Sequence, residues 1–150
     1  MKKILGLVGS LTLISAICAG VLAYVNEITK GPIAETAEKA RAAAKTAVLC
    51  GEEGYTAEGR SSEGYGGDIV LMVGFGEDKK TLVAYKVLAA SETPGLGMKL
   101  STPEFAGQFA GKDGTALSVK KDGGEIEAIT SATITSRAVC RAIADAQGKL

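Results

Sequence analysis

The sequence contains no histidine and no tryptophan, and its acidic and basic side chains balance, with 17 of each. Without histidine, the chain lacks the side chain that most often acts as an acid or base near neutral pH. A formal net charge of zero argues against a nucleic-acid-binding protein, because such proteins usually carry a basic excess. The composition therefore favours neither histidine-based catalysis nor nucleic-acid binding.

Cysteine is also scarce, and the three residues are Cys18, Cys50 and Cys140. Their spacing is too wide for a zinc knuckle or for a CxxC run that holds an iron–sulfur cluster, so no metal site is predicted. Cys18 lies in an apolar run. The other two can pair only if the fold brings them together, and we expect both to be unpaired, small and mostly buried.

The first long feature that is present is an uncharged apolar run over residues 4–25, which follows Lys2 and Lys3. As a helix this run is about 33 Å long, enough to cross the hydrocarbon core of a bilayer. The two lysines favour a cytoplasmic N-terminus, which places the rest of the chain outside the cytoplasm. We therefore predict a transmembrane anchor at residues 1–25. The alternative is a signal peptide that is cleaved among the small residues at 16–23.

The next stretch, residues 26–63, is predicted to form a membrane-proximal helix and loop. Lys-Gly-Pro at residues 30–32 predicts a break after the anchor. The alanine-rich residues 33–49 favour a helix, whereas residues 51–67 are rich in Gly, Glu and Ser and are predicted to be a loop.

The remainder, residues 64–150, is predicted to be one domain. Apolar residues alternate over 69–75 and continue over 82–88, with a polar turn at 77–80 between them, which predicts an antiparallel hairpin. The other expected elements are a short helix at 103–111, short strands at 115–120 and 125–129, and a last helix at 135–147 that stops at Gly148. The fold class is therefore α+β: a small antiparallel sheet packed with helices, preceded by one N-terminal transmembrane helix.

One candidate for chemistry is the stretch Ser91-Glu92-Thr93-Pro94-Gly95-Leu96-Gly97. On its own, Pro-Gly after a strand is typical of a tight turn. The alternative is a ligand loop, in which the two glycines let backbone N–H groups approach a flat ring. Leu96 would pack on that ring, and Glu92 would bind the ligand or fix the loop.

A second candidate is the hydroxyl-rich stretch at residues 127–136, just before the last predicted helix. Such residues normally cap a helix, and Thr133, Thr135 or Ser136 are the candidate caps. A helix start is also a site that binds phosphate, and a threonine hydroxyl there can bind a phosphate or be esterified by one. Residues alone leave both alternatives open.

Taken together, the two stretches resemble the FMN-binding domain of the G subunit of Rnf complexes and of the C subunit of sodium-pumping quinone reductases. The resemblance covers about residues 64–146. It is carried by ETPGLG at 92–97, by PEF, QF and GK within 103–112, and by Thr-Ser-Ala-Thr at 130–133. The family's flavin-attachment motif, called the attachment string below, corresponds to residues 127–133 here. In it, Glu127 stands where the family usually has Asp, and Ser131 where it usually has Gly. If residue 131 requires a positive φ, serine costs about 1 kcal/mol relative to glycine.

The resemblance implies that a separate flavin transferase moves the FMN portion of FAD onto Thr133 as a phosphoester. Glu127 would orient the acceptor or the transferase, residues 92–97 would lie near the isoalloxazine, and no residue of this chain is expected to be catalytic. The full set that the resemblance implies for FMN binding is Thr133 (covalent), Glu92, Thr93, Gly95, Leu96, Gly97, Glu127, Thr130, Ser131, Ala132 and Ile134.

The short chain with one anchor resembles the Rnf G subunit more than the longer quinone-reductase subunit. This implies an electron-transfer subunit of a membrane complex that couples ferredoxin:NAD+ electron transfer to Na+ or H+ translocation, without turnover of its own. Its partners would be the membrane and peripheral subunits. Its place would be a bacterial or archaeal cell membrane, with the flavin domain outside the cytoplasm. Two alternatives are a stand-alone membrane-anchored extracytoplasmic flavoprotein reductase and a flavin-free binding module whose hydroxyls only cap a helix.

Overall fold

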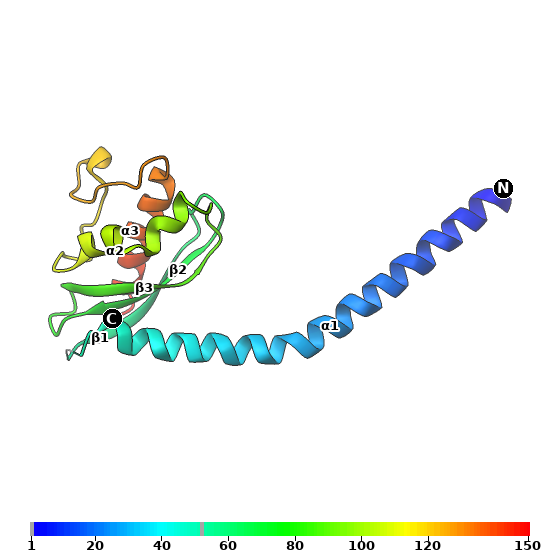
Figure 1. Cartoon of the computed structure of the whole chain (residues 1–150), viewed down its shortest axis with the longest axis horizontal. Coiled ribbons are helices and arrows are strands. Elements are labelled where there is room, and N and C mark those ends of the chain that lie inside the picture. The colour runs from blue at the N-terminus through cyan, green and yellow to red at the C-terminus, as the bar shows by residue number, and fades with distance from the viewer. Residues whose placement is uncertain (1, 52) are drawn as a thin grey trace. The chain divides into compact units, whose positions relative to one another are not determined.

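The computed structural model describes residues 2–51 and 53–150, which form two compact units, one ending at Lys39 and one beginning at Ala40 (Figure 1). The elements, in chain order, are α1 (Lys2–Val48), β1 (Tyr55–Ser61), β2 (Ile69–Phe75), β3 (Leu82–Ala90), η1 (Gly97–Ser101), α2 (Pro103–Ala106), η2 (Gly107–Phe109), η3 (Lys120–Asp122) and α3 (Thr133–Gln147), where η marks a 3-10 helix. A sheet of antiparallel strands with helices around it confirms the predicted α+β class.

Helix α1 runs from Lys2 to Val48 without interruption, so the break predicted at residues 30–32 is wrong. Pro32 lies inside the helix, although a proline there removes one backbone hydrogen bond and costs about 3 kcal/mol. The alanine-rich residues that follow have high helix propensity and favour continuing the helix. Thr36 Oγ1 also donates a hydrogen bond back to the carbonyl of Pro32 at 2.9 Å.

The N-terminal part of α1 exposes the large apolar side chains of the predicted anchor. Leu5 and Leu22, for example, are 75% and 70% exposed. The helix is long and apolar enough to cross a membrane, and it lies near the N-terminus, where a signal sequence has the same character. A segment that is apolar on all sides belongs in the interior of a protein or in lipid.

The sheet has the order β1-β2-β3, and all neighbours are antiparallel. The β2–β3 hairpin was predicted and is confirmed, whereas β1 lies in the stretch that was predicted to be a loop. Gly59 explains the error. A Cβ on Gly59 would lie only 1.9 Å from the carbonyl oxygen of Ala142 in α3, so this glycine allows the helix to approach the strand closely rather than marking a turn.

Strand β2 is covered on both faces. Val73 on one face belongs to the main core together with Val139 and Ile143 of α3, and all three side chains are fully buried. Met72 points to the opposite face and packs with Val48 in the last turn of α1. The alternation of side chains along the strand therefore links α3 and the end of α1 to the same sheet.

The segment between β3 and α3 packs its aromatic residues into the core. The short helix predicted at 103–111 is confirmed as α2 followed by η2. Phe105 and Phe109 are both buried, with ring centroids 5.3 Å apart, and Tyr85 contacts Phe109 edge to face at 5.4 Å. These rings pack the segment after β3 against the sheet.

The short strands predicted at 115–120 and 125–129 are wrong. In the structure, this region holds η3 and a single bridge between Val119 and Ile126. Residues 120–122 form the 3-10 helix η3, which ends at Gly123 with φ 85, and Val119 and Ile126 pair in a parallel sense, so the two segments do not extend as strands from a hairpin turn.

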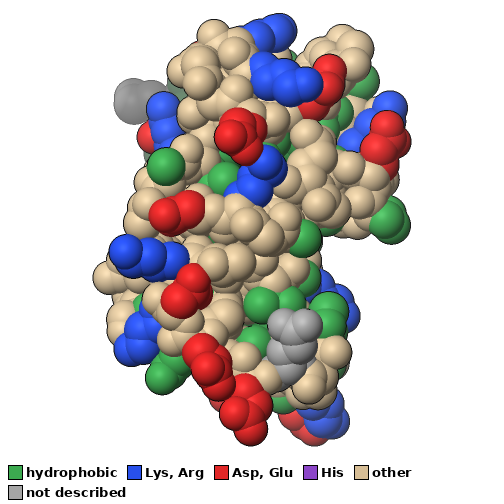
Figure 2. All heavy atoms as spheres, turned by 90° about the vertical axis from the view of Figure 1, so that its left-hand side faces the viewer, with side chains coloured by type: hydrophobic (Ala, Val, Ile, Leu, Met, Phe, Trp, Pro, Cys, Tyr) green, Lys and Arg blue, Asp and Glu red, His purple; other side chains and the backbone are tan. Residues whose placement is uncertain are grey.

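The three cysteines are free thiols. Cys140 is buried as expected, and burial raises its pKa to about 11. Cys50 is exposed, contrary to the expectation, because it lies in the turn after α1 with φ 50. On the face shown in Figure 2, side chains of both signs are interspersed over the surface, in line with the balanced composition.

Candidate functional site

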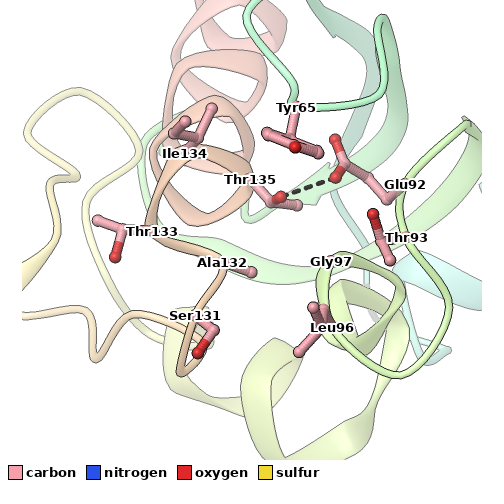
Figure 3. A pocket seen from close by; sticks show the side chains of 10 residues that line it. All are labelled: Tyr65, Glu92, Thr93, Leu96, Gly97, Ser131, Ala132, Thr133, Ile134 and Thr135. Carbon is pink, nitrogen blue, oxygen red and sulfur yellow. Dashed lines mark hydrogen bonds between the residues drawn. The ribbon is translucent and has the colours of Figure 1, made fainter.

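The loop at residues 92–97 and the start of α3 meet around a cavity of about 500 Å³ (Figure 3). This volume lies within the range of sites that bind cofactors and other small molecules. The side chains that line the cavity are those of Tyr65, Glu92, Thr93, Leu96, Gly97, Ser131, Ala132, Thr133, Ile134 and Thr135. Two stretches that are some forty residues apart in the sequence therefore form one site.

Glu92 holds the two walls of the cavity together. Its side chain is only 5% exposed. Thr135 Oγ1 donates a hydrogen bond to Glu92 Oε2 at 2.8 Å (Figure 3), and the backbone N–H of Gly66 donates to Oε1 at 3.3 Å. Because a buried polar group needs hydrogen-bond partners in place of the lost water, these contacts fix the loop to the first turn of α3 and to the turn before β2.

Gly97 leaves the space that Glu92 occupies. A Cβ at position 97 would lie 2.4 Å from Glu92 Oε2 and 3.0 Å from Thr135 Oγ1. Gly95 contributes differently: with φ 76 it supplies the left-handed turn in the loop, and it does not line the cavity. The two glycines of the loop thus serve close approach and chain reversal, respectively.

Helix α3 begins at Thr133, two residues before the predicted start at 135, and its N-cap is Ala132 without a side-chain cap. The prediction that Thr135 or Ser136 caps this helix is therefore wrong. Both hydroxyls lie inside the first turn and have other partners. Thr135 donates to Glu92, while Ser136 Oγ accepts from the N–H of Ile129 at 2.9 Å and donates to the carbonyl of Ala132 at 3.0 Å.

Ser131 has φ 63, in the left-handed region that favours glycine. Because residue 131 has a positive φ, serine at this position carries the expected conformational cost of about 1 kcal/mol relative to glycine. The turn is closed by the N–H of Ala132, which donates to the carbonyl of Ile129 at 2.9 Å. This turn brings residues 131–133 to the cavity, and the serine side chain itself is exposed.

Thr133 is half-buried at the edge of the cavity, and Lys121 Nζ lies 3.3 Å from its Oγ1. Two other candidates from the attachment string, Glu127 and Thr130, are exposed and do not line this cavity. Glu127 forms an ion pair with Lys120 at 2.9 Å, and this hydrogen-bonded contact lowers the pKa of the Glu127 carboxyl. The roles assigned to these residues from the resemblance stay predictions.

Sequence reasoning missed Tyr65 and underestimated Thr135. Tyr65 lines the cavity from the turn before β2, where the surrounding glycines gave only a loop signal. Its ring is 73% exposed, and the nearby Leu96 and Ile134 are 42% and 49% exposed. Exposed aromatic and aliphatic groups around one cavity provide apolar surface that a flat heteroaromatic ring would cover.

These features define a small α+β domain with a cofactor-sized cavity between a glycine-containing loop and a helix that begins with threonine. Residues 64–147 match the family model described as the FMN-binding domain, and the chain belongs to this family. Residues 1–48 match a second model, described as the RnfG N-terminal region. Both matches confirm the resemblance that the sequence motifs indicated.

Curated relatives carry related names. The chain is 43% identical over 90 residues to the G subunit of the ion-translocating oxidoreductase complex of Methanosarcina acetivorans, covering 60% of this chain and 47% of the relative. It is 43% identical over 88 residues to the G subunit of the proton-translocating ferredoxin:NAD(+) oxidoreductase complex of Clostridium ljungdahlii, covering 57% and 47%. For the G subunit of the ion-translocating oxidoreductase complex of Escherichia coli K12, the identity is 40% over 93 residues, covering 57% and 45%. The chain thus spans about half the length of these relatives.

Proposed function

We propose that this protein is the FMN-carrying electron-transfer subunit of a membrane-bound, ion-translocating oxidoreductase complex, with FMN joined to Thr133 through a phosphoester. The observation that carries the proposal is the position of Thr133. It lies at the edge of a cofactor-sized cavity in a domain of the FMN-binding family. Bound FMN would supply a centre that takes up and releases electrons one at a time.

The residues around the cavity fit such a group. The exposed apolar side chains of Tyr65, Leu96 and Ile134 match a flat isoalloxazine ring, and the loop at 92–97 presents backbone to it. Glu92 already has two donors from the protein, so its main task is to hold the loop against α3. A covalent link at Thr133 would keep the cofactor from diffusing away in a compartment where free FMN is scarce.

The complex and the topology are part of the same proposal. The names of the relatives support the role of a G subunit, and the name of the Clostridium ljungdahlii relative includes ferredoxin and NAD+. The apolar helix α1 supports a single membrane crossing. Lys2 and Lys3 favour a cytoplasmic N-terminus, which would place the flavin domain outside the cytoplasm.

The attachment is tested by co-expressing the full chain with a flavin transferase and running a denaturing gel. In-gel flavin fluorescence should accompany the parent and be absent from Thr133→Ala. A control is Ser101→Ala, because Ser101 is an exposed hydroxyl residue outside the string and does not line the cavity. Fluorescence that persists in Thr133→Ala, or that disappears equally in Ser101→Ala, would refute the assignment.

Membership of a complex needs a separate measurement. An affinity-tagged chain, solubilised from its native membrane in mild detergent, should co-purify with multi-spanning partners and with a protein that carries iron–sulfur clusters. Isolation of the tagged chain alone, with turnover of a soluble electron donor, would favour a stand-alone flavoprotein reductase instead.

A further inference from the structure

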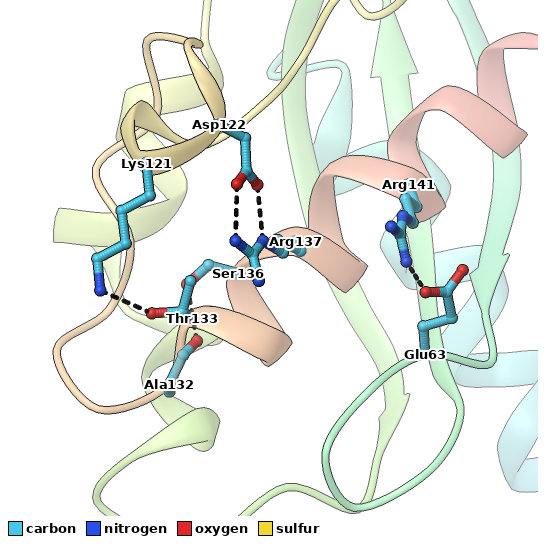
Figure 4. A network of polar contacts seen from close by, with 8 residues as sticks. All are labelled: Glu63, Lys121, Asp122, Ala132, Thr133, Ser136, Arg137 and Arg141. Carbon is cyan, nitrogen blue, oxygen red and sulfur yellow. Dashed lines mark hydrogen bonds and ion pairs between the residues drawn. The ribbon is translucent and has the colours of Figure 1, made fainter.

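The attachment threonine has a cationic neighbour that neither the motif nor the cavity lining includes. Lys121 Nζ lies 3.3 Å from Thr133 Oγ1 (Figure 4). Lys121 belongs to η3, twelve residues before the threonine. The contact places the positive charge of Lys121 beside the hydroxyl that the proposed function assigns to a phosphoester.

The neighbouring basic side chains are already paired with carboxylates. Lys120 pairs with Glu127 at 2.9 Å, and Arg141 pairs with Glu63 (Figure 4). Within residues 2–51 and 53–150, Lys121 has no carboxylate within ion-pair distance. Its charge is therefore available to an anion at Thr133.

An ion pair at the next residue, Asp122, holds η3 close to α3. Arg137 in the second turn of α3 donates through Nε and a terminal nitrogen to the two carboxylate oxygens of Asp122, both at 2.6 Å. The guanidinium holds the pKa of the Asp122 carboxyl below its usual value, so the pair stays charged at neutral pH. A two-point contact of this kind fixes geometry as well as contributing energy. It attaches the end of η3 to the helix that begins with Thr133.

We propose that Lys121 is the positioning residue for the phosphate at Thr133, neutralising its charge during flavin attachment and in the finished phosphodiester. The inference rests on the proposed function. In the attachment step, Thr133 Oγ1 forms a bond to the riboflavin-side phosphorus of FAD. The bond from that phosphorus to the bridging oxygen breaks, AMP leaves with that oxygen, and the hydroxyl proton passes to a base of the transferase. Lys121 would offset the negative charge on the phosphoryl oxygens throughout.

The test measures the initial rate of flavin incorporation into the detergent-solubilised full chain, using purified transferase and FAD. Lys121→Gln should slow incorporation by about tenfold, the loss expected for one charged hydrogen bond. Lys121→Glu should slow it further, and Lys121→Arg should restore most of the rate. Lys120→Gln is the matched control, since that lysine is paired with Glu127, and it should stay within about twofold of the parent.

Two further measurements distinguish an effect of the Lys121 charge from an effect of the substitution on the local structure. Added salt should slow the parent more steeply than Lys121→Gln, because screening acts on the charge that the variant lacks. In the loaded protein, the ³¹P resonance of the ester should shift in Lys121→Gln and stay in place in Lys120→Gln. Asp122→Asn removes the ion pair with Arg137 and should slow incorporation by a smaller factor. It should add little to Lys121→Gln, because Asp122 acts on the phosphate only through the position of Lys121.

The outcomes distinguish the two proposals. If the parent is labelled at Thr133 and Lys121→Gln matches it in rate, salt dependence and ³¹P shift, the inference about Lys121 is wrong and the proposed function stands. If labelling persists in Thr133→Ala or never occurs in the parent, the attachment itself is wrong, and the inference falls with it.

Discussion

Helices α1 and α3 have similar residue compositions, but their large apolar side chains are exposed along most of α1 and mostly buried in α3. Both are rich in alanine with interspersed large aliphatic side chains. Ile17 of α1 is 59% exposed, whereas Ile143 of α3 is fully buried. In α3, charged residues lie outside the core: Arg141 is exposed, and Asp145 is partly buried at the edge of the sheet, where the backbone N–H of Arg60 donates to its carboxylate at 2.8 Å. Residues 4–25 of α1 contain no charge at all. Helix α3 therefore has an inside and an outside, whereas the start of α1 needs an apolar surrounding on every side.

The last turn of α1 departs from the rest of that helix. Ala44 and Val48 are buried and pack with Met72 of β2, in the same compact unit as α3. One continuous helix thus changes from exposed to buried apolar residues along its length. Substitutions along the two helices can locate this change.

The largest contrast is expected between the same substitution in the two helices. Ile143→Ala should lower the free energy of unfolding of the domain by about 2–5 kcal/mol, because it leaves a cavity in the core. Ile17→Ala should leave that free energy unchanged within about 0.5 kcal/mol. The measurement is urea unfolding of the full chain in detergent, followed by near-UV circular dichroism of the tyrosines. A large loss from Ile17→Ala would show that the start of α1 packs on the domain.

The cysteines offer a second test through their reactivity. In lipid vesicles at pH 7, Cys50 should react with a charged maleimide at least about a hundredfold faster than Cys140, whose thiol is buried with a pKa raised to about 11. Cys18 should react only with an uncharged, membrane-permeant maleimide if its helix spans the bilayer. Single-cysteine variants and mass spectrometry give the rates. Fast labelling of Cys18 by the charged reagent would contradict the membrane assignment.

A smaller effect is expected at the point where α1 becomes buried. Val48→Ala should destabilise the domain by about 2 kcal/mol, since it removes methyl groups from a side chain that is only 1% exposed and that packs against β2. Val21→Ala, at an exposed position of the same helix, is the control and should have no measurable effect. Equal urea midpoints for Val48→Ala and the parent would place the boundary of the folded unit after α1 rather than within it.

The smallest effect concerns the turn that leads into α3. Ser131→Gly should stabilise the domain by up to about 1 kcal/mol, because glycine adopts φ 63 without the steric cost of a Cβ. The greater freedom of glycine in the unfolded chain reduces this gain. Thermal unfolding of flavin-free protein measures it, and a lower melting temperature in Ser131→Gly would mean that the serine side chain makes a stabilising contact.

The strands and helix that were predicted correctly have strong periodic patterns of their own. Apolar residues alternate along β2, and α3 repeats them at helical spacing, so local sequence was sufficient. Strand β1 was missed because its evidence is not local: Gly59 is explained only by the carbonyl of Ala142, which approaches from α3. The predicted strands at 115–120 and 125–129 are absent because the residues between them form the 3-10 helix η3, and only Val119 and Ile126 pair.

At the site, sequence motifs identified most of the cavity lining but not what each hydroxyl does. Thr133 was singled out through the resemblance, and the structure places it at the cavity edge. That Thr135 bonds to Glu92 could not be predicted, because the two are 43 residues apart. Tyr65 lies in a turn and Lys121 in the short 3-10 helix η3, and neither has a periodic pattern around it, so only the folded chain shows that they are neighbours of Thr133 and its cavity.

The contact between Glu92 and Gly97 constrains how the loop can change over time. The first and last residues of the ETPGLG string touch. The space between them holds the Glu92 carboxylate and leaves no room for a Cβ on residue 97. Replacing Gly97 by alanine would push Glu92 away from Thr135, so such a change is tolerable only if position 92 becomes smaller as well. Substitutions at these two positions are therefore coupled. A library randomised at both positions should return paired replacements rather than independent ones.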